Sequence, residues 1–401
     1  MRQEASEKSS ERGRGAGATQ VPFGANEVRL NGRQWIAVIL LVGLVIGLLP
    51  SLWLSWERIP FSDRFRVPYE LSKDYWLYEK YLEHMDGPDS VFVVGDSVVW
   101  GEYVTADGTL SAFLDELAGD KTTFVNAGVN GLFPLALEGL VQSYGDVMKG
   151  RRVLLHCNLL WMTSPEADLS SEKEQRFNHP TLVPQFSPRI PSYRASFDER
   201  LSVLVGRTVP FLGFVRHLQN VYFDQKGMYQ WTLADDGDYP PSYPNSYRMP
   251  WATIDFEVPG ESPSDPDRGE NSERHKPWST TGEGTQNFEW VALNRSQQWA
   301  AFQRLVELLL RRDNTLLVVV GPLNRHIMSG ENQRLFDERV SQVEEWLKAQ
   351  SVAYVKPELL AFDLYGDASH PLTEGYRQMA EELWQDQTFQ AWIEAGASSA
   401  K

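Results

Sequence analysis

Short apolar runs rich in β-branched residues recur along the chain after residue 89. They occupy residues 90–97, 122–128, 152–158, 315–321 and 352–356. Stretches with the apolar spacing of helices lie between them, at residues 109–117, 132–148, 297–312 and 332–349. Nearly continuous apolar strands that alternate with helices are typical of a parallel sheet covered by helices on both faces. The pattern therefore predicts an α/β fold built on a parallel sheet.

A longer apolar stretch lies nearer the N-terminus. Residues 34–56 contain no charged side chain, with Trp35 at one end and Trp53 and Trp56 at the other. About 20 helical residues span roughly 30 Å, the hydrocarbon thickness of a bilayer, and tryptophans gather at both bilayer interfaces. The stretch is long for a buried core helix or a cleaved signal peptide, and no A-x-A pattern follows it. We therefore expect a transmembrane signal-anchor.

Basic residues flank this stretch on both sides. Two precede it and four follow it within a similar distance, namely Arg29, Arg33, Arg58, Arg64, Arg66 and Lys73. This count does not favour a cytoplasmic tail, but large domains can cross a membrane largely regardless of charge. The flanks alone leave the orientation open.

These features divide the chain into a tail, an anchor, a connector and one large domain. The tail is rich in Ser, Gly, Glu and Arg and is expected to be disordered. Helical patterns are also present at residues 74–85 and 196–221. The predicted segments are 1–33 (tail), 34–56 (anchor), 57–88 (connector), 89–394 (domain) and 395–401 (C-terminal tail).

The regular alternation breaks after the third apolar run. Residues 164–295 are rich in Pro, Asp, Ser, Gly and Tyr and have too little apolar periodicity for a core of their own. We expect one long insertion there. At the carboxyl end of a central strand it would overhang the crevice where α/β sheets bind ligands, as a lid or substrate platform. A surface loop without such a role is the alternative.

Charge and composition narrow the possible functions. The net charge of −16 argues against general nucleic-acid binding, because phosphate backbones would repel the chain. Cys157 is the only cysteine, so no intrachain disulfide and no zinc site of several cysteines can form. The seven histidines show no HExxH pattern and no paired spacing. We expect neither a metal nor another cofactor.

Two short motifs have the residue types of a nucleophilic site. Gly95-Asp96-Ser97 ends the first apolar run, where a tight turn would present a serine hydroxyl above the sheet edge. Asp367 and His370, after the fifth run, are close enough for the carboxylate to orient the imidazole. Parallel strands bring both motifs to the same sheet edge. The alternative is that Asp367 caps the following helix and His370 is solvated.

Three blocks in this order resemble the SGNH (GDSL-like) hydrolases. They are Gly95-Asp96-Ser97, Asn126-Ala-Gly-Val-Asn-Gly131, and Asp-x-x-His-Pro-x-x-x-Gly-Tyr at 367–376. The resemblance covers roughly residues 89–158 and 313–394. It implies a flavodoxin-like sheet of five parallel strands, with Ser97 as nucleophile. It also implies that the backbone N–H groups of Ser97 and Gly131 hold the oxyanion.

The third block of the family departs from its pattern of Gly-x-Asn-Asp after the third strand. Here the sequence is His156-Cys157-Asn158-Leu-Leu-Trp, and Asn158 is the best candidate for a side-chain oxyanion donor. In the alternative, Asn158 only ends the strand and the Thr163-Ser164 pair supplies the donor. We expect His156 and Cys157 to be buried.

The loop after the fourth run contains Asn324 and Arg325, which could contact a substrate or acyl donor. Its Pro-x-Asn pattern is similar to anchored members of the teichoic-acid D-alanylation type. Polar loop residues that face water are the alternative.

Together these features predict a membrane-anchored serine esterase or O-acyltransferase. Anchored relatives commonly modify cell-surface glycans, so we expect an acyl ester of an exported glycan as substrate, an extracytoplasmic domain, and polysaccharide-modification partners. Nothing in the residues distinguishes water from a sugar hydroxyl as acceptor. The alternative is a non-catalytic glycan-binding or assembly component, for which insertion aromatics such as Trp231 and Trp251 would suit glycan stacking.

Overall fold

The computed structural model describes residues 30–119, 122–223, 225–226, 254–261, 276–278 and 285–398. It consists of two units, Met1–Leu52 and Trp53–Lys401. Most of the predicted N-terminal tail and much of the predicted insertion, including Trp231 and Trp251, lie outside the described residues.

The predicted anchor is a single helix. Helix α1 covers Gly32–Trp56 and has a mean hydropathy of 2.6 in its most apolar window, with none of that window buried. Its length and composition suit a membrane anchor or an N-terminal signal sequence.

The second unit is built on a five-stranded sheet in the order β2-β1-β3-β4-β5, with every neighbouring pair parallel. The strands are β1 (Ser90–Gly95), β2 (Thr123–Gly128), β3 (Arg152–Cys157), β4 (Thr315–Val320) and β5 (Ala353–Val355). Each lies within one of the five apolar runs, so the predicted α/β class and the strand positions are confirmed.

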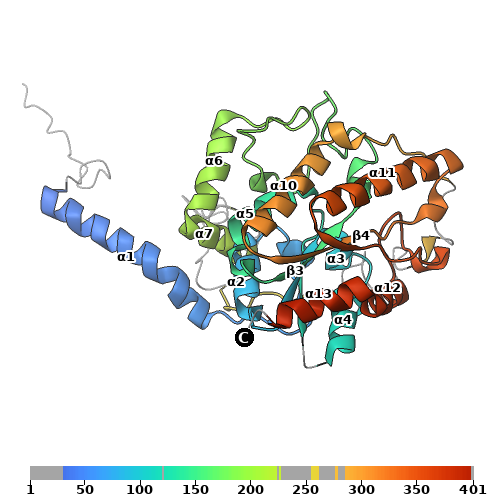
Figure 1. Ribbon diagram of the computed structural model, residues 1–401. Coiled ribbons are helices and arrows are strands. Elements are labelled where there is room, and N and C mark those ends of the chain that lie inside the picture. The colour runs from blue at the N-terminus through green and yellow to red at the C-terminus, as the bar shows by residue number, and fades with distance from the viewer. Residues whose placement is uncertain are drawn as a thin grey trace, which may run out of the picture. The chain divides into compact units, whose positions relative to one another are not determined.

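Helices pack on both faces of this sheet (Figure 1). One face is covered by α2 (Tyr75–Met85), α5 (Pro134–Tyr144), α10 (Gln297–Arg311) and α11 (Gly330–Ala349). The other is covered by α4 (Leu110–Ala118), α12 (Thr373–Gln385) and α13 (Gln387–Ser398). In β1, for example, Val94 joins the first cluster and Val93 the second, because successive side chains of a strand point to opposite faces. This two-sided burial explains why the strands are apolar without alternation.

The structure differs from the prediction at residues 196–221 and at the C-terminus. The single helix expected at 196–221 is two helices, α6 (Phe197–Thr208) and α7 (Pro210–Tyr222). Pro210 lacks an N–H and disfavours a helical conformation at Val209, so it ends one helix and begins the next. The C-terminal tail expected from residue 395 also begins too early, because α13 continues to Ser398.

The described parts of the chain between β3 and β4 pack onto the main core. Leu169, Leu182, Ile190 and Leu293 all belong to the cluster that includes α5 and α10. Those parts therefore share the core of the sheet, which agrees with their weak apolar periodicity.

Candidate active site

The serine of the first motif stands on a tightly packed turn. Strand β1 ends at Gly95, and the short helix α3 (Ser97–Trp100) begins at once, with Asp96 capping it through a 3.0 Å hydrogen bond from Val98 N. A Cβ on Gly95 would lie 2.5 Å from Val99 Cγ2, and one on the paired Gly128 would lie 2.5 Å from Trp100 N. Only glycine leaves room for α3 to lie against the ends of β1 and β2.

The second motif meets the serine at this edge. His370 Nε2 lies 2.8 Å from Ser97 Oγ, and His370 Nδ1 lies 2.8 Å from Asp367 Oδ2. The backbone N–H groups of Ser369 and His370 both donate to Asp367 Oδ1 at 2.9 Å. Helix α12 has no side-chain cap at its N-terminus, so Asp367 does not cap it. The structure thus brings Ser97, His370 and Asp367 into one hydrogen-bonded line.

The electrostatics of this line suit proton transfer. Burial alone would raise the pKa of Asp367, but the charge and hydrogen bond of His370 and the two backbone donors hold that pKa below its ordinary value. Burial alone would lower the pKa of His370, but Asp367 outweighs it, with smaller contributions from Asp96 and Glu102, so the pKa is raised. His370 is therefore a stronger base than an isolated imidazole.

Tyr103 completes the surroundings of Asp367. Its hydroxyl donates to Asp367 Oδ2 at 2.9 Å, and its ring meets the His370 ring edge-on with centroids 5.2 Å apart. Sequence reasoning missed Tyr103, because no local pattern connects it with a residue 264 positions away.

Gly131 lies in the loop after β2, which begins beside the turn that carries Ser97, where Val129 N donates to Gly95 O at 3.3 Å. Its φ of +72° is in the left-handed region that favours glycine. A Cβ there would also lie 2.6 Å from the side-chain nitrogen of Asn178, which belongs to the segment between β3 and β4. Its role as an oxyanion donor stays a prediction.

Asn158 points to the turn that carries the serine. Its Nδ2 donates to Asp96 Oδ2 at 2.9 Å, and its Oδ1 accepts from Leu160 N at 3.0 Å. It therefore ends β3, as the alternative supposed, and also contacts the residue before Ser97. An amide nitrogen carries two hydrogens, so one remains for an oxyanion.

Asp96 is the centre of a buried cluster. Besides Asn158, its carboxylate meets His156 Nδ1 at 3.0 Å and accepts from Trp161 Nε1 at 3.1 Å. Burial alone would raise the pKa of Asp96, but the charge and hydrogen bond of His156 and the bond from Asn158 hold it below its ordinary value. His156 and Cys157 are buried as expected. Sequence reasoning did not foresee that His156 and Trp161 converge on Asp96.

Asn324 holds the loop that carries Asp367 and His370. Its backbone N donates to Ala368 O at 2.9 Å, and its Nδ2 donates to Asp367 O at 3.1 Å. The residue is fully buried, and its amide nitrogen holds the loop. The expected contact of Asn324 with a substrate stays a prediction. Arg325 forms an ion pair with Asp337 and is half-exposed, which leaves a ligand contact open to test.

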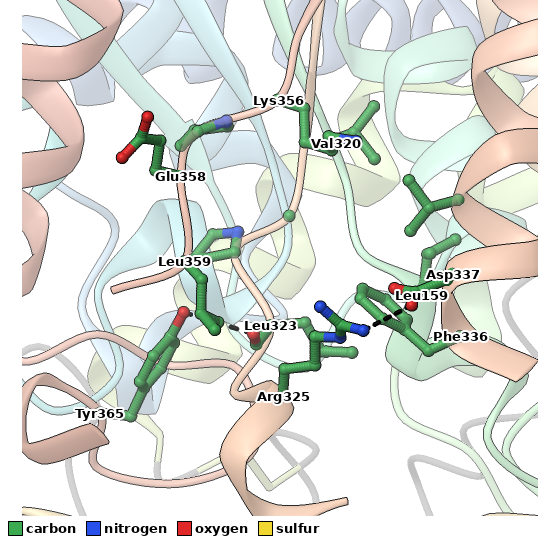
Figure 2. A pocket seen from close by; sticks show the side chains of 14 residues that line it. Leu159, Val320, Leu323, Arg325, Phe336, Asp337, Lys356, Glu358, Leu359 and Tyr365 are labelled. Atoms are coloured by element: carbon green, nitrogen blue, oxygen red, sulfur yellow. Dashed lines mark hydrogen bonds and ion pairs between the residues drawn. The ribbon is translucent and has the colours of Figure 1, made fainter. Parts of the chain in front are cut away.

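Arg325 also lines a cavity of about 270 Å³ at the carboxyl ends of β4 and β5 (Figure 2). Its wall is mostly apolar, with Leu159, Leu323 and Phe336 among the lining residues. The hydroxyl of Tyr365 donates to Leu323 O at 3.3 Å on one side. Tyr365 forms a backbone bridge to Pro371, so the cavity adjoins the Asp367–His370 loop, although Ser97 does not line it.

Neither a metal site in the described part of the chain nor a known relative assigns a function to this site. Within the described residues, no group of three or more His, Cys, Asp or Glu side chains is arranged to hold a metal ion. No model of a known protein family matches the chain, and no curated protein matches it. The geometry described above therefore carries the functional argument.

Proposed function

We propose that this chain is a membrane-anchored serine hydrolase or acyltransferase of the SGNH type that acts on an acyl ester. The observation that carries the proposal is the line from Ser97 Oγ through His370 to Asp367, with both contacts of the imidazole at 2.8 Å. Ser97 begins a helix directly after a strand of a parallel sheet, which is where the nucleophilic serine of α/β-hydrolases stands.

The reaction begins when Ser97 Oγ attacks the ester carbonyl carbon and His370 Nε2 takes the hydroxyl proton. Asp367 stabilises the resulting imidazolium. The oxyanion accepts from Ser97 N–H, which starts α3 and so has no partner within that helix, from Gly131 N–H, and from the second amide hydrogen of Asn158. His370 then protonates the leaving alcohol, and an acyl-Ser97 ester remains. Water or a sugar hydroxyl, deprotonated by His370, takes the acyl group and regenerates the serine.

The arrangement of the sheet supports the same family. Its order, 2-1-3-4-5, is that of flavodoxin-like doubly wound sheets, which bind ligands outside the carboxyl ends of their strands. Ser97, Asn158 and the Asp367–His370 loop all follow strands at that end.

The resemblance and the apolar helix α1 support a proposal for the substrate and the location. Anchored members commonly modify cell-surface glycans, so an acyl ester of an exported glycan is the proposed substrate, with polysaccharide-modification proteins as partners. The catalytic unit then stands on the extracytoplasmic side of the membrane that α1 crosses.

One observation favours a second function, a glycan-binding component without turnover. Asn158 commits one amide hydrogen to Asp96, which constrains how it can turn toward an oxyanion. A fluorophosphonate probe separates the two functions. It should label the wild-type protein and the matched Ser341→Ala variant, whose serine is exposed on α11, and fail to label Ser97→Ala. A wild-type protein that does not react would contradict the proposal.

A further inference from the structure

Helix α6 exposes its apolar side chains to solvent. One helical face, spaced at i, i+4, i+7 and i+8, holds Phe197, Leu201, Leu204 and Val205, which are 68%, 43%, 44% and 40% exposed. The buried side of the helix has only Val203. The four exposed residues are called the α6 apolar face below. An amphipathic helix usually turns such a face inward, so this orientation needs a cause.

The helix is held firmly in this orientation. Ser196 and Glu199 form a complete capping box at its N-terminus. Near its C-terminus, Arg207 donates to Ser143 Oγ at 2.7 Å and to Leu182 O at 3.0 Å. These contacts fix which side of α6 faces outward, and the apolar face is therefore a fixed property of the fold.

The following helix, α7, packs against the residues that come directly after the apolar segment of the first unit. Phe214 and Tyr222 contact the Trp53 ring, with centroids 6.1 and 5.6 Å away. His217 bridges Asp74 at 2.8 Å and Glu57 at 2.9 Å, and all three side chains are at most 1% exposed. The hairpin of α6 and α7 is thus joined to the point where the chain leaves the predicted anchor.

The sequence segment that contains the hairpin has a net charge opposite to that of the whole chain. Residues 186–223 contain five arginines and two carboxylates, a net charge of +3, in a chain with a net charge of −16. Interfacial helices combine an apolar face with cationic residues, and anionic headgroups attract such segments.

We propose that the α6 apolar face lies in the interfacial layer of an anionic bilayer, as a second membrane contact beside the anchor. Tryptophans such as Trp53 favour the depth at which headgroups begin, and α7 is packed onto that tryptophan. The contact would hold the catalytic unit in one orientation on the membrane.

Site-specific fluorescence on the full-length chain in phosphatidylglycerol nanodiscs tests this contact. Because Cys157 is fully buried, a thiol-reactive environment-sensitive dye labels only an introduced cysteine. Lipid-borne nitroxides should quench the dye on Leu204→Cys severalfold more than on the exposed controls Ser202→Cys, on the same helix, and Ser341→Cys, on α11. Aqueous iodide should show the reverse order. In phosphatidylcholine discs the nitroxide quenching at position 204 should fall.

Four results would contradict the proposal. Iodide that reaches position 204 as readily as position 341 would place the face in water. Shielding from both quenchers would place it against protein, such as a second copy of the chain. A dye on Val42→Cys in α1 that nitroxides do not quench would remove the anchor on which the second contact depends. Equal quenching in both lipids would refute the anionic preference.

Discussion

His370 and His217 each use both ring nitrogens, yet the two clusters differ in what stands at the far end of the imidazole. His370 joins a carboxylate to a serine hydroxyl, and its side chain remains 13% exposed. His217 joins two carboxylates, and its side chain is completely buried. Burial alone would lower the pKa of His217, but Asp74 and Glu57 raise it to about 9. A proton held between two carboxylates stabilises the fold, whereas an imidazole that ends on a hydroxyl can accept the proton of that hydroxyl.

Replacing each histidine with glutamine should separate these roles most sharply. His370→Gln should lower kcat for an aryl ester by roughly 10⁴-fold or more, because the proton acceptor is lost, with little change in melting temperature. His217→Gln should cost on the order of 3–5 kcal/mol of unfolding free energy, because two buried carboxylates lose their cation, and leave kcat per folded molecule near wild type. Kinetics and thermal melts on both variants, with the exposed His84→Gln as control, measure this. A His217→Gln variant that melts like wild type would contradict the comparison.

Substitutions at Asn158 test the proposed oxyanion site beside Ser97. Asn158→Ala should lower kcat by about 10²-fold, since the proposed oxyanion donor is lost. It should also lower the melting temperature, since Asp96 loses a buried donor. Asn158→Asp should be worse, because two carboxylates would then meet. Thr163 Oγ1 donates to Leu160 O and Ser164 Oγ accepts from Ala167 N, so alanine at either position should leave kcat nearly intact. If Thr163→Ala or Ser164→Ala lowers kcat instead, this pair and not Asn158 supplies the oxyanion donor.

The raised pKa of His217 gives stability a pH dependence. Its contribution is fully present below the ordinary histidine value of 6.5 and is lost as pH rises through about 9. The unfolding free energy should therefore fall by on the order of 3 kcal/mol between pH 6.5 and pH 10. Denaturant titrations across this range should show the slope in wild type and a flatter one in His217→Gln. Equal slopes in both proteins would mean that His217 is not charged in the fold.

The smallest expected effect concerns Tyr103. Tyr103→Phe removes a donor to Asp367, so the carboxylate attracts the imidazolium more strongly and the pKa of His370 rises further. The acidic limb of kcat/KM should move to higher pH, and kcat should fall by roughly tenfold at most. A pH–rate profile decides this, with Tyr69→Phe, an exposed tyrosine, as control. A limb that moves to lower pH would argue against the assigned contact.

The parts of the site that could be predicted from sequence are those that depend on local spacing. Asp367 and His370 are three residues apart, and parallel strands necessarily bring their carboxyl ends to one edge, where Ser97 already stands. The cluster of Glu57, Asp74 and His217 has no such spacing, since His217 is at least 143 positions from the other two. For Asn324 the sequence placed the residue in the correct loop, but it could not tell which way the side chain points. Pro210 could have predicted the break between α6 and α7, but the single helix predicted at 196–221 did not take it into account.

The two glycines that end β1 and β2 have a consequence for mutational screens of activity. Gly95 and Gly128 leave no room for a Cβ against α3, so any substitution displaces the helix that presents Ser97. A saturation screen scored on turnover would rank both positions with Ser97, the proposed nucleophile, although neither has a side chain that could contact an ester. Positions that do not tolerate substitution would then include residues that pack against α3 as well as the reacting groups. An active site defined from such data would include at least these two positions in error.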